Sequence, residues 1–134
     1  MAYYITQADI ENVFGTENVA TWSNLDSDST TADTDRITAA IAWAEQEIND
    51  RFRGGPYALP FSALSSGGLR PIIDWCAKLA GAWLYQSRGI DLETNPVADA
   101  LLSVESSIRA YQAGQRRLDC ARSGTSGMQA PQMV

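Results

Sequence analysis

The stretch of residues 34–52, TDRITAAIAWAEQEINDRF, decides the fold class of this chain. Its apolar residues recur every three or four positions, which is the period of one face of an amphipathic helix. They are Ile37, Ile41, Ala44, Ile48 and Phe52. Asp33 or Thr34 can cap the first turn, and the glycines and the proline at 54–56 end the helix. The stretch therefore predicts a long helix that buries one face against its neighbours.

Further segments on either side of this stretch carry helix signals. They span residues 6–15, 16–22, 71–87 and 95–113, and the second is the weakest. Thr6 and Asp9 occupy the positions of a capping box, and Asn95 with Pro96 makes a strong helix start. Residues 71–87 are apolar nearly all round, which predicts a central helix. We therefore expect an all-α protein, a compact bundle of about four helices.

A loop between the predicted helices, residues 56–68, PYALPFSALSSGG, is apolar for a loop. Two prolines and a closing pair of glycines argue against a helix here. One interpretation is a loop that folds back over its own helices, and the other is an arm that packs on a neighbouring subunit. In the second case Tyr57, Leu59 and Phe61 make the subunit contact.

The last twenty residues, 115–134, differ in composition from the rest of the chain. Their sequence, QRRLDCARSGTSGMQAPQMV, is basic at its start, rich in glycine and serine at its end, and holds one clear apolar anchor, Leu118. Such a segment buries too little apolar surface to order itself. We therefore expect a helical domain over residues 1–114 and a C-terminal tail over residues 115–134 that is disordered alone or ordered by a partner.

Acidic and basic residues are divided unevenly along the 134-residue chain, whose net charge is −6. Residues 1–50 hold ten acidic residues and one basic residue, whereas residues 51–134 hold six acidic and nine basic ones. Four of the acids lie in or next to one polar loop, namely Asp26, Asp28, Asp33 and Asp35. This charge belongs either to a solvated loop or to a contact between copies, because an acidic half attracts a basic half head to tail.

Several kinds of chemistry lack the residues that they need. The sequence holds no histidine, so it has no Ser/His/Asp or Cys/His set. A calcium loop that starts at Asp26 needs glycine at position 31 and glutamate at position 37, where the chain has Thr31 and Ile37. Cys76 and Cys120 are too far apart for a metal-binding pattern. We expect no metal, no cofactor and no enzymatic activity.

The sequence also argues against membrane insertion and tight DNA binding. The longest apolar stretch, residues 71–85, is too short to span a bilayer and contains Asp74 and Lys78. The first residues lack a basic segment followed by an apolar run, so we expect no signal peptide. The domain also lacks the basic face that phosphate neutralisation requires. We expect a protein of a reducing cytosol without a membrane partner.

The order of several short patterns resembles the small head–tail adaptor, or connector, proteins of Mu-like tailed phages and prophages. The resemblance covers residues 3–114, and it departs from the shorter family pattern in the loop 61–68 and after Gly114. In chain order the patterns are Tyr4-Ile5-Thr6, Asp9-Ile10, Phe14-Gly15, the acidic loop, the helix with Ile37, Ala40, Ala44, Glu47 and Ile48, then Tyr57-x-Leu59-Pro60, Leu84-Tyr85 and Arg88-Gly89.

The resemblance implies a structural role in the virion neck, for a protein made in the cytoplasm of the host bacterium. Such adaptors form a ring, usually of twelve copies, below the portal, and the ring extends the DNA channel and docks the next neck or stopper protein. Genomic DNA passes through without sequence-specific binding. The resemblance transfers no catalytic residues. We expect the tail to contact the portal through Arg116, Arg117, Leu118 and Arg122.

Three hypotheses about function stay open at this point: an adaptor, a small helical binding module, and a small enzyme that uses carboxylates. The acids at 26–35 line the lumen of the ring, where they repel DNA and let it slide, or they take part in subunit contacts. The alternative to an adaptor is a small cytosolic helical module that binds or regulates another protein. The mass in solution and on the virion, and a map of the phage neck, distinguish these functions.

Overall fold

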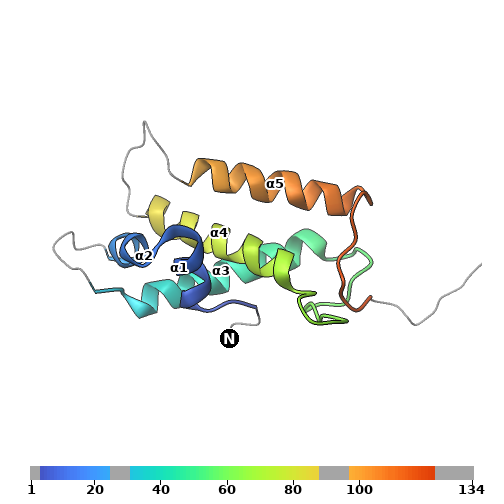
Figure 1. Ribbon diagram of the computed structural model, residues 1–134, viewed down its shortest axis with the longest axis horizontal. Helices are drawn as coiled ribbons and strands as arrows, with labels where there is room; N and C mark the ends of the chain where they lie inside the picture. The colour runs from blue at the N-terminus through green and yellow to red at the C-terminus, as the bar shows by residue number, and fades with distance from the viewer. Residues whose placement is uncertain (1–3, 25–30, 88–96, 123–134) are drawn as a thin grey trace, which may run out of the picture.

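The computed structural model describes residues 4–24, 31–87 and 97–122 (Figure 1). These ranges form five α-helices and contain no β-strand, which confirms the all-α class. The helices are α1 (Gln7–Phe14), α2 (Thr16–Ser23), α3 (Thr34–Phe52), α4 (Arg70–Ser87) and α5 (Ala98–Gln112). The weakest expected segment, residues 16–22, is a full helix, so there are five helices where about four were expected. The expected helix start at Asn95 and Pro96 lies outside the described residues.

The central helix of the bundle is α4, which contacts α1, α2, α3 and α5. It has this place because it is apolar on nearly all sides, with Ile72, Trp75, Leu79 and Leu84 all buried. Figure 1 shows it between α3 and α5. Cys76 is fully buried in the same helix, as expected for a small core residue.

The long helix α3 begins and ends where its sequence predicts. Asp33 is the cap, because its Oδ1 accepts hydrogen bonds from the backbone N–H groups of Asp35 at 3.1 Å and Arg36 at 3.2 Å. The predicted apolar stripe faces the core, and Ile37, Ala44 and Ile48 are almost fully buried. At 1.5 Å per residue its 19 residues span about 28 Å, so α3 runs through much of the molecule.

The N-terminal segment is anchored to α3 by a buried carboxylate. Glu45 Oε2 accepts the backbone N–H groups of Tyr4 at 2.8 Å and Ile5 at 3.0 Å. The Tyr4 hydroxyl donates to Asn49 Oδ1 at 2.6 Å and accepts the backbone N–H of Phe61 at 2.9 Å. Its burial raises the pKa of Tyr4 to about 12. One tyrosine thus joins the start of the chain to α3 and to the loop at 56–68.

The short helices α1 and α2 cover one half of α4. The predicted capping box starts α1, since the backbone N–H of Thr6 donates to Asp9 Oδ2 at 2.8 Å. At its other end the Phe14 ring lies directly over Gly81 of α4, where a Cβ atom would overlap the ring. Glycine is therefore favoured at this helix crossing, because a larger side chain would have to displace the Phe14 ring or the helix that carries it.

The helices give the molecule two distinct ends. Figure 1 shows α3 and α5 running in the same direction, while α4 returns between them. The ends of α3 and α5 and the start of α4 therefore lie together at one end, where the segment 114–122 also lies. The start of α3 lies near α2 at the other end, where the Asp33 backbone N–H donates to Ser23 Oγ at 2.9 Å.

Candidate functional site

The expected subunit arm is mostly part of this chain's own core. Tyr57 is 6% exposed and Phe61 is 5% exposed, and both rings pack against Phe52. This differs from the expectation that they contact a neighbouring subunit, and it supports the other interpretation, a loop folded over its own helices. The physical reason is that the two rings form an aromatic cluster with Phe52 and Trp75. Burial of this cluster within one chain removes its apolar surface from water. Leu59 is half-buried and packs at the edge of the core.

The first part of the expected tail, residues 115–122, is docked on that loop. The backbone N–H of Ala58 donates to Ala121 O at 3.0 Å, that of Leu64 to Asp119 O at 2.9 Å, and that of Ala121 to Ser62 O at 2.8 Å. Two isolated antiparallel bridges, Tyr57 with Arg122 and Ala63 with Cys120, belong to the same contact. The ordered contacts therefore extend beyond the boundary expected at residue 114.

Two apolar side chains hold the docked segment in place. Leu118 is 5% exposed and Cys120 is 1% exposed, and the backbone N–H of Leu118 donates to the Tyr57 hydroxyl oxygen at 2.8 Å. Gly68 permits the close approach, because a Cβ there would overlap the carbonyl oxygen of Asp119. Leu118 was expected to contact the portal, but it is buried in its own chain. Residues 123–134 lie outside the described residues.

A basic pocket of about 470 Å³ lies where the docked segment meets the ends of α3 and α5. Five arginines line it, and no acidic residue is among the described residues that do so. The arginines are Arg51, Arg53, Arg116, Arg117 and Arg122. Tyr57 and Tyr111 contribute aromatic walls, and the turn at 54–56 forms one side. Three of the four residues expected to form a portal contact therefore line one concave site together with Arg51 of α3 and Arg53, which follows that helix.

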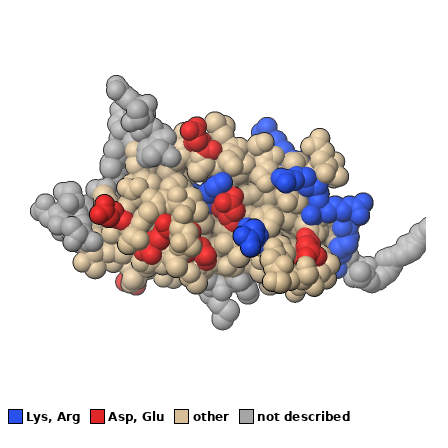
Figure 2. Space-filling model, viewed as in Figure 1, with Lys and Arg blue, Asp and Glu red and all other residues tan. Residues whose placement is uncertain are grey.

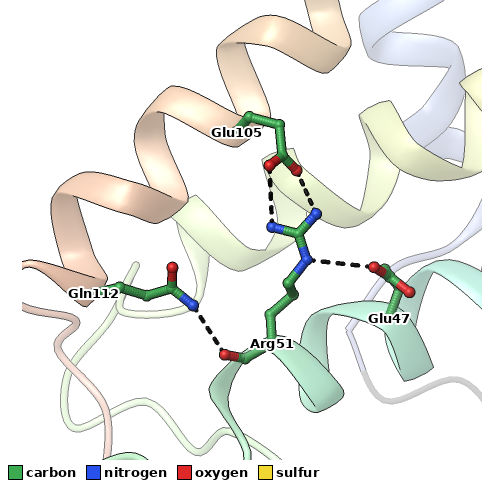
Figure 3. Close-up of polar contacts among 4 residues, drawn as sticks. All are labelled: Glu47, Arg51, Glu105 and Gln112. Carbon is green, nitrogen blue, oxygen red and sulfur yellow. Dashed lines mark hydrogen bonds and ion pairs between the residues drawn. The ribbon is translucent and has the colours of Figure 1, made fainter.

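One of these arginines ties the site to the bundle (Figure 3). Arg51 Nη1 donates to Glu105 Oε1 at 3.3 Å, Nη2 pairs with Glu105 Oε2, and Nε donates to Glu47 Oε2 at 3.3 Å. Gln112 Nε2 donates to the backbone carbonyl of Arg51 at 2.9 Å. The bidentate pair raises the pKa of Arg51 and lowers that of Glu105. Arg51 thus joins α3 to α5 and also lines the basic pocket.

The other four arginines of the pocket are exposed to solvent. Arg53 is exposed and pairs with Asp50 at 2.8 Å. Arg116 lies 5.5 Å from the centre of the Tyr111 ring, and Arg122 lies 5.5 Å from that of Tyr57, which are cation–π distances. Arg116 and Arg117 are both exposed and form no ion pair with an acidic side chain in the described ranges.

No described acidic residue lines this pocket, but Glu47, Asp50 and Glu105 lie beside it as ion-pair partners of Arg51 and Arg53. Figure 2 shows the basic residues gathered mainly at the end that carries the docked segment, whereas most acidic residues on this face lie over the remainder of the molecule. Asp33 is half-buried and caps α3, and Asp35 is exposed in the first turn. Asp26 and Asp28 lie outside the described residues.

Other chemistry has little support in the described ranges. No group of three or more His, Cys, Asp or Glu side chains there is arranged to hold a metal ion. Cys76 and Cys120 are free and buried, and burial raises the pKa of both thiols, which keeps them protonated and weakly nucleophilic at neutral pH. No described helix has the length and apolar character that a membrane span needs.

The sequence carries a local signal for the docked segment but none for the pocket as a whole. Leu118 and Cys120 alternate with exposed residues, which is the period of an extended segment with one buried side. By themselves, Arg51 and Arg53 are favourable charges at the end of a helix. Nothing in their spacing shows that they meet Arg116, which is more than sixty residues away along the chain.

Comparison with known proteins adds one match. The sequence matches the family described as "Bacteriophage Mu, Gp36" over residues 4–133. No curated protein matches the chain. The matched range includes all five helices, the loop at 56–68 and the whole basic pocket.

Proposed function

The chain belongs to the family described as Bacteriophage Mu, Gp36, and from this membership we propose that it is a structural protein of the phage particle, a head–tail adaptor. Copies of the chain form a ring, expected to hold twelve, below the portal of the filled head. The ring extends the DNA channel and presents a docking surface for the next neck or stopper protein. The observation that carries the proposal is a family match that extends over nearly the whole chain.

The shape and charge of the subunit support a ring. A ring needs two different surfaces on each subunit that fit one another, because its contacts are heterologous. This subunit has a basic pocket at one end and most of its described carboxylates elsewhere (Figure 2).

Exposed apolar side chains offer contact sites for the neighbouring proteins in the neck. Trp43 of α3 is 42% exposed, Leu64 in the loop is 67% exposed, and Leu102 of α5 is 68% exposed. We expect contacts with the portal or with the next neck protein to use such residues, since large apolar side chains are enriched in the cores of interfaces.

The proposal is tested on phage particles. Purified particles are analysed by mass spectrometry for the chain, and a map of their neck is determined by electron microscopy. We expect the chain in the particle and a closed ring of copies between portal and tail. A particle that lacks the chain, while the chain persists as a monomer or dimer in the infected cell, would contradict the proposal and favour a cytosolic binding module.

A further inference from the structure

The basic pocket is a concave site lined by five arginines, and the adaptor role does not by itself say what occupies it. We propose that it receives carboxylates from the acidic half of a second copy of this chain, so that copies associate head to tail. The acidic half is defined here by the described carboxylates of α1, α2 and the first turn of α3 with its cap, namely Asp9, Glu11, Glu17, Asp33 and Asp35. The inference rests on the ring proposed above and names the surfaces that form it.

The first argument is the chemistry of the pocket. A guanidinium group presents several N–H donors in a planar fork, which matches the two oxygens of a carboxylate. Five such groups surround a space of about 470 Å³, and no described residue that lines it is acidic. The intramolecular partners Glu47 and Glu105 neutralise Arg51, and Asp50 partly neutralises Arg53. Arg116 and Arg117 thus provide the main uncompensated positive charge.

The second argument is preorganisation. Arg116 and Arg122 each lie over a tyrosine ring, and the backbone that carries them is bonded to the loop at 56–68. Leu118 and Cys120 are buried between these arginines and fix the segment on the core. Groups that are already held in position lose less conformational entropy when a partner binds. The docked segment therefore presents its arginines as a surface, in contrast to a flexible basic tail.

The third argument decides between a second copy and nucleic acid. The start and the end of α3 are about 28 Å apart, and the first carries Asp33 and Asp35 while the second carries Arg51 and Arg53. One rigid helix therefore separates the two charges, as a heterologous contact requires. A DNA duplex instead needs an extended basic face, but the charged side chains on the rest of the face shown in Figure 2 are mostly acidic, and the chain has a net charge of −6. Charge complementarity thus favours a second copy as the occupant.

The test uses charge reversal in the full chain. The pocket variant carries Arg116→Glu and Arg117→Glu, and the acidic-half variant carries Glu17→Arg and Asp35→Arg. A control variant carries Arg70→Glu and Arg109→Glu, which change the charge by the same amount as the pocket variant at exposed positions outside the basic pocket. Circular dichroism and urea unfolding first establish that all the variants are folded.

Association is then measured by sedimentation velocity at concentrations up to about 1 mM, in about 0.1 M and about 1 M salt. We expect the wild-type chain to associate, and the association to weaken at high salt, where the screening length falls from about 10 Å to about 3 Å. The pocket variant and the acidic-half variant should each associate at least about tenfold more weakly than the control. An equimolar mixture of the two should regain association, because each then presents a surface complementary to the other.

Several results would overturn the inference. They are a wild-type chain that stays monomeric under these conditions, a pocket variant that associates as well as the control, or a mixture without recovery. Loss of binding to a labelled DNA duplex in the pocket variant, with association unchanged, would assign the pocket to nucleic-acid phosphates instead. The adaptor proposal is tested separately, because none of these results bears on whether the chain is present in the particle or forms a ring in the map of the neck.

Discussion

At the scale of single residues, two charged side chains connect elements rather than merely facing solvent. The buried carboxylate of Glu45 accepts two backbone N–H groups and holds the start of the chain on α3. Arg51 bridges Glu47 of its own helix and Glu105 of α5 (Figure 3). Neither role follows from the charge alone, because a charge on a helix surface is usually solvated.

The pair of Arg51 and Glu105 predicts a pH-dependent contribution to stability. The arginine lowers the pKa of Glu105 in the folded chain below that of an unfolded glutamate, about 4.3. Its contribution is therefore present above about pH 4.3 and is lost as the pH falls through the lowered folded pKa. We expect Glu105→Gln to lower the free energy of unfolding by about 0.5–1 kcal/mol at neutral pH, a value limited by solvent screening. Urea unfolding as a function of pH measures it.

The difference between wild type and Glu105→Gln should shrink as the pH falls below about 4. Asp99→Asn is the control, because Asp99 is an exposed carboxylate of the same helix that has no ion-pair partner among the described residues. A Glu105→Gln effect that is the same at low and neutral pH would show that the amide loses packing or hydrogen bonding and not the ion pair.

At the scale of elements, the bundle depends on how closely its helices approach α4. Helix α1 packs closely on α4 because Gly81 has no side chain, and the Phe14 ring of α1 covers that position. Glycine inside a helix normally costs about 1 kcal/mol relative to alanine. Glycine is still the favoured residue at this crossing, because the overlap of a larger side chain with the Phe14 ring would cost more than the lower helix propensity of glycine.

We expect Gly81→Ala to lower the free energy of unfolding by about 1–3 kcal/mol, although alanine is the better helix former. Denaturant unfolding measures this change. Combining it with Phe14→Leu should recover part of the loss, since the smaller side chain leaves room for the new methyl group. A single Gly81→Ala variant as stable as the wild type would mean that Phe14 moves aside without cost.

At the scale of the whole molecule, the docked segment, residues 115–122, covers the end of the bundle where the basic pocket lies. Its contacts with the loop at 56–68 are mainly backbone hydrogen bonds, and Leu118 with Cys120 fills space beside the aromatic cluster. Segments far apart in the sequence thereby form one wall of the basic pocket. The same docking gives the molecule its charge polarity, because it adds three arginines to the end where α3 also ends.

We expect a chain that stops after Gly114 to lose about 2–5 kcal/mol of unfolding free energy, because the core loses Leu118 and Cys120. Denaturant unfolding of the truncated chain measures the loss. A chain that stops after Arg122 is the matched control, since it keeps every described contact. Equal stability of the two truncated chains would contradict an energetic role for the docked segment.

Much of the architecture was predictable because it depends on local patterns. The start and end of α3, the capping box of α1 and the central place of α4 follow from spacing, capping residues and apolar character. The docked segment was not predicted, because its two isolated bridges depend on a loop segment about sixty residues away. For the same reason the sequence left open whether Tyr57 and Phe61 pack on their own helices or on a neighbouring subunit.

The sequence by itself determined the helices, the fold class and the division into an acidic first part and a basic second part, because helix formation and charge are properties of neighbouring residues. Only the tertiary structure decided where those charges meet. It placed Arg51 and Arg53 beside Arg116, Arg117 and Arg122, because the return of the chain along α4 and α5 brings the end of α3 next to the docked segment. Contacts of this kind depend on packing between distant segments, which local sequence patterns do not encode.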